Sequence, residues 1–129
     1  MNPVVHFEMP YRDRARAARF YAEAFDWQTQ LLGPEMGDYL LVTTALTDAN
    51  PAGVKGAING GLFPYKADWP DQYPSIVVGV QDISVAMARV TKAGGEVLGA
   101  PMEIPGVGHY VSFRDTEGNR NSMMQSAMG

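Results

Sequence analysis

The chain has 129 residues, of which 46% are hydrophobic and 19% charged, a balance typical of one globular domain or of two small joined modules. The formal net charge is −4 and lysines and arginines form no runs, so the basic footprint of a nucleic-acid-binding protein is missing. The absence of cysteine excludes disulfides, thiolate metal ligands and a cysteine nucleophile.

The first residues, MNPVVHFEMPYRD, show neither the cationic start nor the apolar run of a secretory signal peptide. No stretch approaches the roughly 18 apolar residues of a membrane-spanning helix. We therefore expect a cytoplasmic protein that has neither a membrane nor a nucleic acid as its partner.

The first predicted strand, PVVHFEM at residues 3–9, alternates in polarity. Successive side chains of a strand point to opposite faces, so His6 and Glu8 should share one face while Phe7 and Met9 occupy the other. A histidine and a carboxylate side by side can grip a ligand, begin a metal site or form a hydrated polar pair.

A helix is predicted next, over residues 13–25, with Asp13 as its N-cap. Its buried stripe follows the i, i+3, i+7 spacing and consists of Ala18, Tyr21 and Phe25. Three strand-like runs follow: QTQLL, YLLVTT and AINGGLF. The turn-forming GPEMGD separates the first two, and a loop at residues 47–56 precedes the third.

The second half repeats this order. PSIVVGV predicts a strand, Asp82 is placed to cap a helix over residues 82–93, and Gly94-Gly95 supplies the left-handed stop after it. Three strands follow: EVLGAPMEI, GHYVSFRD and NRNSMMQ, with TEG as the hairpin turn between the last two.

The two halves align at a nearly constant offset. Asp82 lies 69 residues after Asp13, and the same offset carries His6 to Ser75. GDYLLV and GHYVSF align at an offset of 71. The sequence therefore predicts an α+β fold of two βαβββ modules, about residues 3–63 and 74–126, joined by a linker of about residues 64–73 in a single domain spanning residues 1–129.

Neither module would bury its helix and sheet well alone. We therefore expect the two to form one curved mixed sheet, with the helices outside and a concave face inside. The phase of the first strands would place His6, Glu8, Ser75 and Val77 on the concave face.

VVHFEMPYRDRARAARFYAEAFDW resembles the first module of glyoxalase-like proteins, the vicinal oxygen chelate superfamily of glyoxalases, bleomycin-resistance proteins and extradiol dioxygenases. GHYVSFRDTEGNRNSMMQ is similar to the final hairpin of that superfamily. The likeness covers about residues 3–125. It implies the glyoxalase-like cup and, because members commonly dimerise, a homodimer.

The resemblance also implies a ligand pattern, since members that catalyse reactions usually hold a divalent metal with His, Glu and Gln side chains on four strands. Carried onto this sequence, the first ligand position matches His6, its counterpart in the second module is Ser75, and the final glutamate position falls at Ser122. The remaining position lies among residues 59–61, Asn-Gly-Gly.

His6 is thus the one good metal ligand that the resemblance leaves. A zinc or nickel site needs about three or four protein ligands, so a divalent metal cofactor is disfavoured. Glu8 would rescue the site if it chelated beside His6, and His109 would do so if its strand turned inward.

Several polar residues are candidates for contact with a small-molecule ligand. Glu8 can raise the basicity of His6 and make this pair catalytic through general-base chemistry. His109 follows Gly108 and lies either at a ligand or in solvent. Arg120 shares the predicted face of Ser122, where it would need Glu8 or an anionic ligand as partner, unless it reaches solvent.

The leading hypothesis is a protein that binds a small organic molecule in its cup without a complete metal site, using His6, Glu8 and Arg120 for selectivity. One alternative is a metal-dependent lyase, isomerase or dioxygenase with His6 as first ligand. A metal-free acid–base enzyme using His6 and Glu8 is another. A third is an interaction module whose contact surface is the aromatic linker around Trp69.

Overall fold

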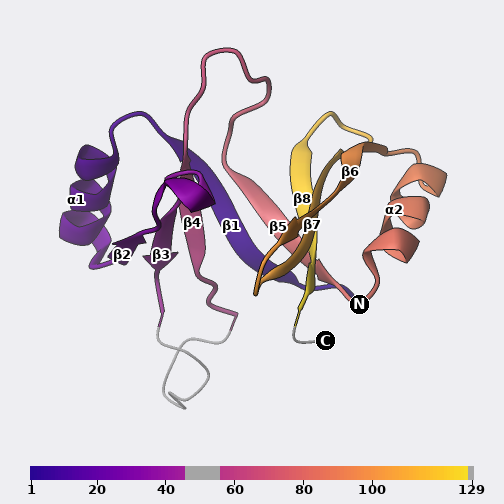
Figure 1. Ribbon diagram of the computed structural model, residues 1–129, viewed down its shortest axis with the longest axis horizontal. Helices are drawn as coiled ribbons and strands as arrows, with labels where there is room; N and C mark the ends of the chain where they lie inside the picture. The colour runs from indigo at the N-terminus through magenta and orange to yellow at the C-terminus, as the bar shows by residue number, and fades with distance from the viewer. Residues whose placement is uncertain (46–55, 128–129) are drawn as a thin grey trace. The chain divides into compact units, whose positions relative to one another are not determined.

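The computed structural model describes residues 1–45 and 56–127, so the loop predicted at residues 47–56 lies almost wholly outside the described residues. The chain forms two compact units (Figure 1). The first unit comprises residues 6–74, and the second comprises residues 1–5 with residues 75 onward. The element order is strand, helix and three strands, twice over, which confirms the α+β class and the two βαβββ modules.

The first unit carries one helix on a four-stranded mixed sheet. Its elements are β1 (Val4–Tyr11), α1 (Arg14–Phe25), β2 (Gln28–Leu31), the 3-10 turn η1 (Pro34–Met36), β3 (Leu40–Thr43) and β4 (Gly60–Pro64). The strand order is β2-β3-β4-β1, with β1 parallel to β4 and the other pairs antiparallel.

The second unit has the same plan. Its elements are β5 (Ser75–Val80), α2 (Ile83–Lys92), β6 (Glu96–Ile104), β7 (Gly108–Arg114) and β8 (Arg120–Ser126). The strand order is β5-β8-β7-β6, with β5 parallel to β8. The first residues of the chain belong here because the N–H of Gly79 donates to the carbonyl of Pro3 at 2.8 Å.

Both helices begin at the predicted aspartates. The carboxylate of Asp13 accepts from the N–H of Arg16 at 3.0 Å, and that of Asp82 accepts from the N–H of Val85 at 3.1 Å. Each bond satisfies an N–H that has no partner within its own helix. The glycine stop after α2 is also confirmed, because Gly94 has a φ of 100°.

The final hairpin turns on Asp115. Its carboxylate accepts from the backbone N–H groups of Glu117 and Asn119, both at 2.9 Å, and from the amide of the Asn119 side chain at 3.0 Å. Hydrogen bonding to Asn119 lowers the pKa of Asp115. The segment DTEGN, residues 115–119, therefore fixes the turn that sets the register of β7 on β8.

The core of the first unit is an aliphatic cluster capped by aromatic rings. Leu40, Val42 and Leu62 are 2–3% exposed, and Phe7 and Met9 pack against them as the strand alternation predicts.

Tyr21 of α1 stacks on Trp27, with ring centroids 4.6 Å apart and an interplanar angle of 8°. The expected burial of Phe25 is wrong: it is 61% exposed, because it ends the last turn of α1.

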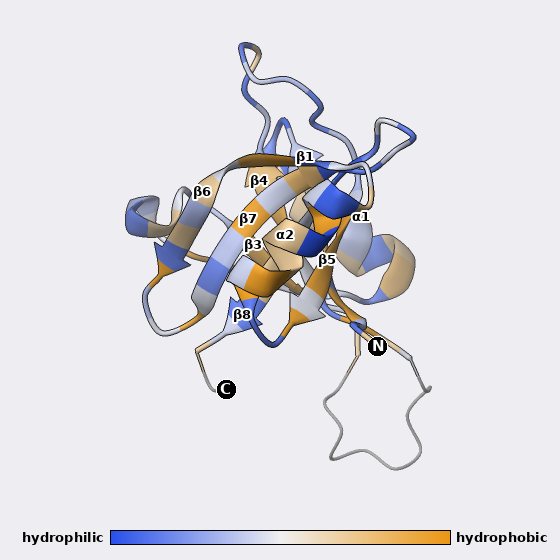
Figure 2. Cartoon of the chain, turned by 90° about the vertical axis from the view of Figure 1, so that its right-hand side faces the viewer, coloured by the Kyte–Doolittle hydropathy of each residue, from blue (hydrophilic) through white to orange (hydrophobic). Residues whose placement is uncertain are grey.

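The core of the second unit lies under α2. It consists of Ile83, Ala86, Val111 and Met123, with Val78 and Val80 of β5 packed against it. Figure 2 shows α2 lying over the strands of this unit. The predicted phase of β5 is therefore correct for Val78 and Val80. None of the helices within residues 1–45 and 56–127 is long and apolar enough to cross a membrane.

Trp27 should carry a large share of the stability of the first unit. We expect Trp27→Ala to lower the free energy of unfolding by about 3 kcal/mol, because it removes a ring that packs on Tyr21 and Phe7. Urea unfolding followed by circular dichroism measures the change. Trp69→Ala is the matched control: that ring is 54% exposed, and its loss should cost less than about 1 kcal/mol. Equal losses in the two variants would contradict this account of the core.

Candidate functional site

The candidate site lies on the face of β1 that points away from the core of the first unit. His6 and Glu8 are two residues apart and both are half-buried. Phe7 and Met9, which alternate with them, pack in the core. His6 and Glu8 therefore form what we call the polar face of β1.

A third side chain joins the two. The hydroxyl of Tyr39 lies 2.7 Å from Nε2 of His6 and donates to Oε2 of Glu8 at 2.9 Å. The imidazole and phenol rings are nearly parallel, at 18°, with centroids 6.3 Å apart. We refer to this three-residue arrangement as the tyrosine bridge.

A glycine makes room for the bridge. Gly61 of β4 pairs with Glu8 across the parallel ladder, and a β-carbon added at Gly61 would meet the ring and hydroxyl of Tyr39 at 2.1–2.2 Å. Real β-carbons essentially never approach so closely, so the phenol of Tyr39 and a side chain at position 61 exclude one another.

The hydrogen bonds define where protons sit. The phenol has one proton, and donating it to Glu8 leaves its oxygen to accept from Nε2–H of His6. A neutral His6 then presents Nδ1 as an acceptor. Burial lowers the pKa of His6 below its ordinary 6.5, and the negative charge of Glu8 opposes this without reversing it.

The second unit contains a related arrangement. Tyr110, which lies 71 residues after Tyr39, has its hydroxyl 2.6 Å from Oγ of Ser122. Oγ of Ser112 lies 3.1 Å from the same atom. Ser122 is 3% exposed, so its hydroxyl is engaged by neighbouring hydroxyls in a buried position.

These residues do not fit the divalent metal of the superfamily described above. Among residues 59–61, where the remaining ligand of the first module is expected, Gly60 and Gly61 have no side chain, and Oδ1 of Asn59 already accepts from the N–H groups of Thr44 and Ala45 at 2.8 and 3.0 Å. The ring of Tyr39 lies over Gly61. In the second unit the expected positions are Ser75 and Ser122, whose neutral hydroxyls are poor ligands for zinc or nickel. No cluster of three or more histidine or carboxylate groups suited to a metal occurs in the described part of the chain.

The remaining sequence-predicted residues of the second unit divide between two faces. Arg120 is half-buried and shares the face of Ser122 on β8, opposite Arg114, whose guanidinium lies 3.7 Å from Glu96. His109 is exposed and falls on the other face, since it alternates with Tyr110 and shares its phase with the buried Val111.

Ser75 and Val77 of β5 are the remaining residues predicted on the concave face. Ser75 begins β5 and is half-buried, while Val77 is 1% exposed and pairs with Ser122. Of the predicted polar residues, Ser75, Arg120 and Ser122 thus share one face of the second unit, His109 lies on the other face, and His6 and Glu8 meet in the tyrosine bridge of the first.

Tyr39 is the residue that sequence reasoning missed. The alignment of GDYLLV with GHYVSF matches Tyr39 with Tyr110, but it does not indicate which polar groups either ring meets. The missing signal was the pairing of a tyrosine on one strand with a glycine on the next, which marks a place where a ring lies over bare backbone.

Comparison with known proteins supports the resemblance seen in the sequence. The family model of the Glyoxalase/Bleomycin resistance protein/Dioxygenase superfamily matches residues 4–123. A glyoxylase-like domain-containing protein from Didymella fabae is 29% identical over 119 residues, covering 90% of this chain and 88% of the relative.

Solved structures share the fold. A methylmalonyl-CoA epimerase variant from Streptomyces coelicolor, in complex with 2-nitronate-propionyl-CoA, matches with a TM-score of 0.68 at 17% identity, covering 98% of this chain and 99% of that one. The epimerase from Mycobacterium tuberculosis matches with a TM-score of 0.68 at 13% identity, covering 97% and 88%. At such identities the likeness shows the fold alone.

The burial of His6 makes stability depend on pH. Burial in the folded state lowers the pKa of His6. The stability that neutral His6 contributes is therefore fully present above about pH 6.5, the pKa of the unfolded chain. It is lost as the pH falls toward the lower pKa of the folded state. The free energy of unfolding should therefore fall between pH 7 and pH 5, and fall less in His6→Gln.

Urea melts at several pH values measure this slope, and NMR of the imidazole ring locates the titration. The chain has two histidines, so His109→Gln leaves the His6 signals alone in the spectrum and serves as the control. A His6 midpoint above 6.5 would contradict the assigned environment.

Proposed function

Because the chain belongs to the Glyoxalase/Bleomycin resistance protein/Dioxygenase superfamily, we propose that it binds a small organic molecule at the polar face of β1 without a metal ion. The tyrosine bridge is the observation that carries this proposal. The phenol of Tyr39 occupies the space in which a metal-ligating side chain at position 61 would stand, and it satisfies His6 and Glu8 by hydrogen bonds.

The chemistry of the bridge suggests which ligand groups it would recognise. A neutral His6 that donates through Nε2 offers Nδ1 to a hydroxyl or amine of the ligand. Around these few polar groups a small-molecule site is otherwise apolar. We also propose Ser75, Arg120 and Ser122 as ligand contacts of the second unit, and His109 as a contact that would meet a ligand from the opposite face of β7. Arg120 suits a carboxylate or phenolate, because a guanidinium pairs with such groups by two hydrogen bonds.

A metal-free acid–base reaction is the second candidate, with His6 and Glu8 as catalytic residues. The hydrogen bonds from His6 through Tyr39 to Glu8 form a continuous path along which a proton can move between imidazole and carboxylate. The epimerases that share the fold make an isomerisation a reasonable reaction to assay first.

Metal titration tests the proposed function against a metal-dependent lyase, isomerase or dioxygenase. We expect calorimetry with nickel, zinc and iron(II) to show no stoichiometric binding, and elemental analysis of protein purified without chelator to find no bound metal. The donor set is too small to retain an ion. A metal bound at one equivalent per chain, and lost in His6→Ala, would overturn the proposal.

For the small organic ligand, His6→Ala and Tyr39→Phe should each weaken binding at least about tenfold, the equivalent of about 1.4 kcal/mol.

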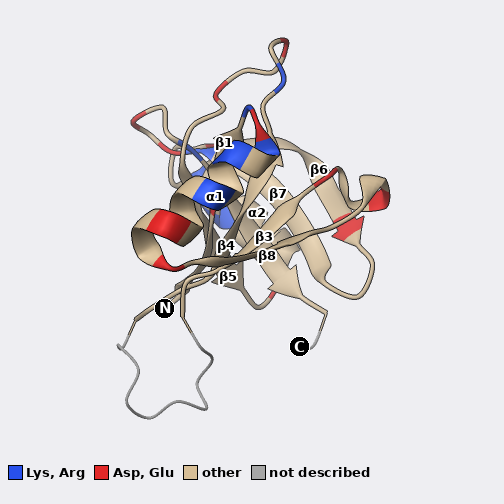
Figure 3. Ribbon diagram, turned by 90° about the vertical axis from the view of Figure 1, so that its left-hand side faces the viewer, with Lys and Arg blue, Asp and Glu red and all other residues tan. Residues whose placement is uncertain are grey.

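A homodimer in the cytoplasm is the proposed state of the protein, and α1 offers a self-complementary surface for it. Arg16, Phe20 and Glu23 fall at i, i+4 and i+7 on one ridge of the helix. Phe20 is 55% exposed. Figure 3 shows basic residues toward one end of α1 and acidic residues toward the other. Two antiparallel copies would place Phe20 against Phe20 and each Arg16 against the partner copy's acidic end.

Charge exchange on this ridge tests the dimer. We expect light scattering to show a dimer for the native chain and a monomer for Phe20→Ser and Arg16→Glu. The double change of Arg16→Glu with Glu23→Arg should restore the dimer, because it preserves self-complementarity. Val85→Ser on α2, which alters a residue that is also 55% exposed, is the control and should stay dimeric. A native chain that is monomeric at micromolar concentration would refute this interface.

A further inference from the structure

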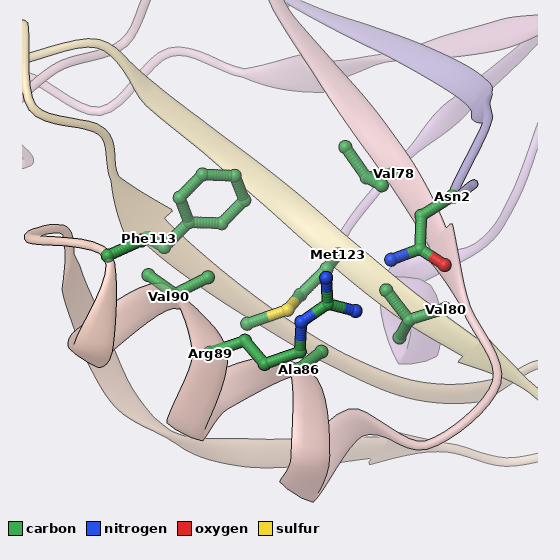
Figure 4. A pocket seen from close by; sticks show the side chains of 9 residues that line it. Asn2, Val78, Val80, Ala86, Arg89, Val90, Phe113 and Met123 are labelled. Carbon is green, nitrogen blue, oxygen red and sulfur yellow. The ribbon is translucent and has the colours of Figure 1, made fainter.

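A pocket of about 290 Å³ lies between α2 and the sheet of the second unit, and none of its lining residues belongs to the tyrosine bridge (Figure 4). Its apolar lining is Val78, Val80, Ala86, Val90, Ala93, Phe113 and Met123. The volume is close to the lower end of the range for small-molecule sites.

The internal repeat explains why the space is open. At the offset of 69 residues, Val90 of α2 corresponds to Tyr21 of α1. In the first unit Tyr21 stacks on Trp27, and its hydroxyl donates to the sulfur of Met9 at 3.9 Å, so aromatic groups fill the layer between helix and sheet. The second unit has a valine at the equivalent place, and Gly95 corresponds to Trp27, since Gln28 and Glu96 begin equivalent strands and pair with Thr43 and Arg114 respectively.

The pocket also has a polar side. Its lining includes the side chains of Arg89 and Asn2, and Figure 4 shows the guanidinium of Arg89 extending from α2 toward the space between helix and strands. Within residues 1–45 and 56–127, the guanidinium of Arg89 has no ion-pair or hydrogen-bond partner. An apolar pocket beside a cation suits a ligand that has a hydrocarbon body and a single negative charge.

We propose that this pocket is a second binding site, which takes a small hydrocarbon carboxylate. The alkyl or aryl body lies against the methyl groups of Val78 and Val90 and the ring of Phe113, where it displaces water from apolar surface. The carboxylate pairs with the fork of Arg89, a geometry that an ammonium or a neutral hydroxyl group does not reproduce. The amide of Asn2 supplies a further donor.

Binding of octanoate, octanol and octylamine tests the two parts of this site. We expect octanoate to shift the NMR signals of the Val78 and Met123 methyl groups saturably, with octanol weaker and octylamine weakest. Arg89→Gln should weaken octanoate binding about tenfold and leave octanol unchanged. Lys92→Gln removes another cation from the same helix, outside the pocket lining, and should bind octanoate as the native chain does.

Val90→Tyr tests the cavity itself, since it restores the residue type found at the equivalent place in α1. It should remove binding of both octanoate and octanol, and a melting curve would show that the variant is folded. If Val90→Tyr does not fold, Ala93→Leu fills the same pocket from an exposed position at the end of α2 and should have the same effect on binding.

Two results would overturn the proposal: no saturable octanoate binding by the native chain, or equal binding of octanoate and octylamine. His6→Ala separates this site from the proposed function, because it should leave octanoate binding intact. Octanoate binding that disappears in His6→Ala would assign the ligand to the polar face of β1 instead and would likewise refute the second site.

Discussion

The hydroxyl of Tyr39, held between His6 and Glu8, is the interaction that determines the hydrogen bonding of the polar face of β1. One phenol proton cannot serve two acceptors, so its donation to Glu8 obliges His6 to donate through Nε2. The same contact excludes a side chain from position 61, because the ring lies against the backbone of Gly61. The donor role of Nε2 of His6 and the exclusion of a side chain at position 61 thus both follow from the placement of one ring.

In the second unit, different residues also satisfy shielded polar groups by hydrogen bonds to a tyrosine. Tyr110, the counterpart of Tyr39, hydrogen-bonds to Ser122, which stands where the superfamily places its final glutamate. In one unit a tyrosine covers a glycine, and in the other it bonds a buried serine. Both arrangements satisfy polar groups that are shielded from water, and neither needs an ion to do so. Both the residue types at the expected ligand positions and the packing around them therefore fit a divalent metal poorly.

The sequence predicted the local features well, because short-range physics decides them. Asp13 and Asp82 cap helices, Asp115 fixes the hairpin, and alternation along β1 and β5 assigns Phe7 and Val78 to cores. The tyrosine bridge was beyond such reasoning. It joins residues more than 30 positions apart, and its geometry depends on which residue of β4 lies beside Glu8. Periodicity gives the face of a strand, but it does not give the register of its neighbour.

The two faces of each strand serve different purposes because side chains alternate between them. On β1, Glu8 takes part in the bridge while its neighbour Met9 packs under α1. A substitution on one face leaves the other face in place, provided that the backbone ladder is kept. The duplicated modules show this independence at equivalent positions. Tyr39 and Tyr110 remain alike on one face, whereas Tyr21 and Val90 differ on the other, and that difference closes the layer in the first unit and opens a pocket in the second.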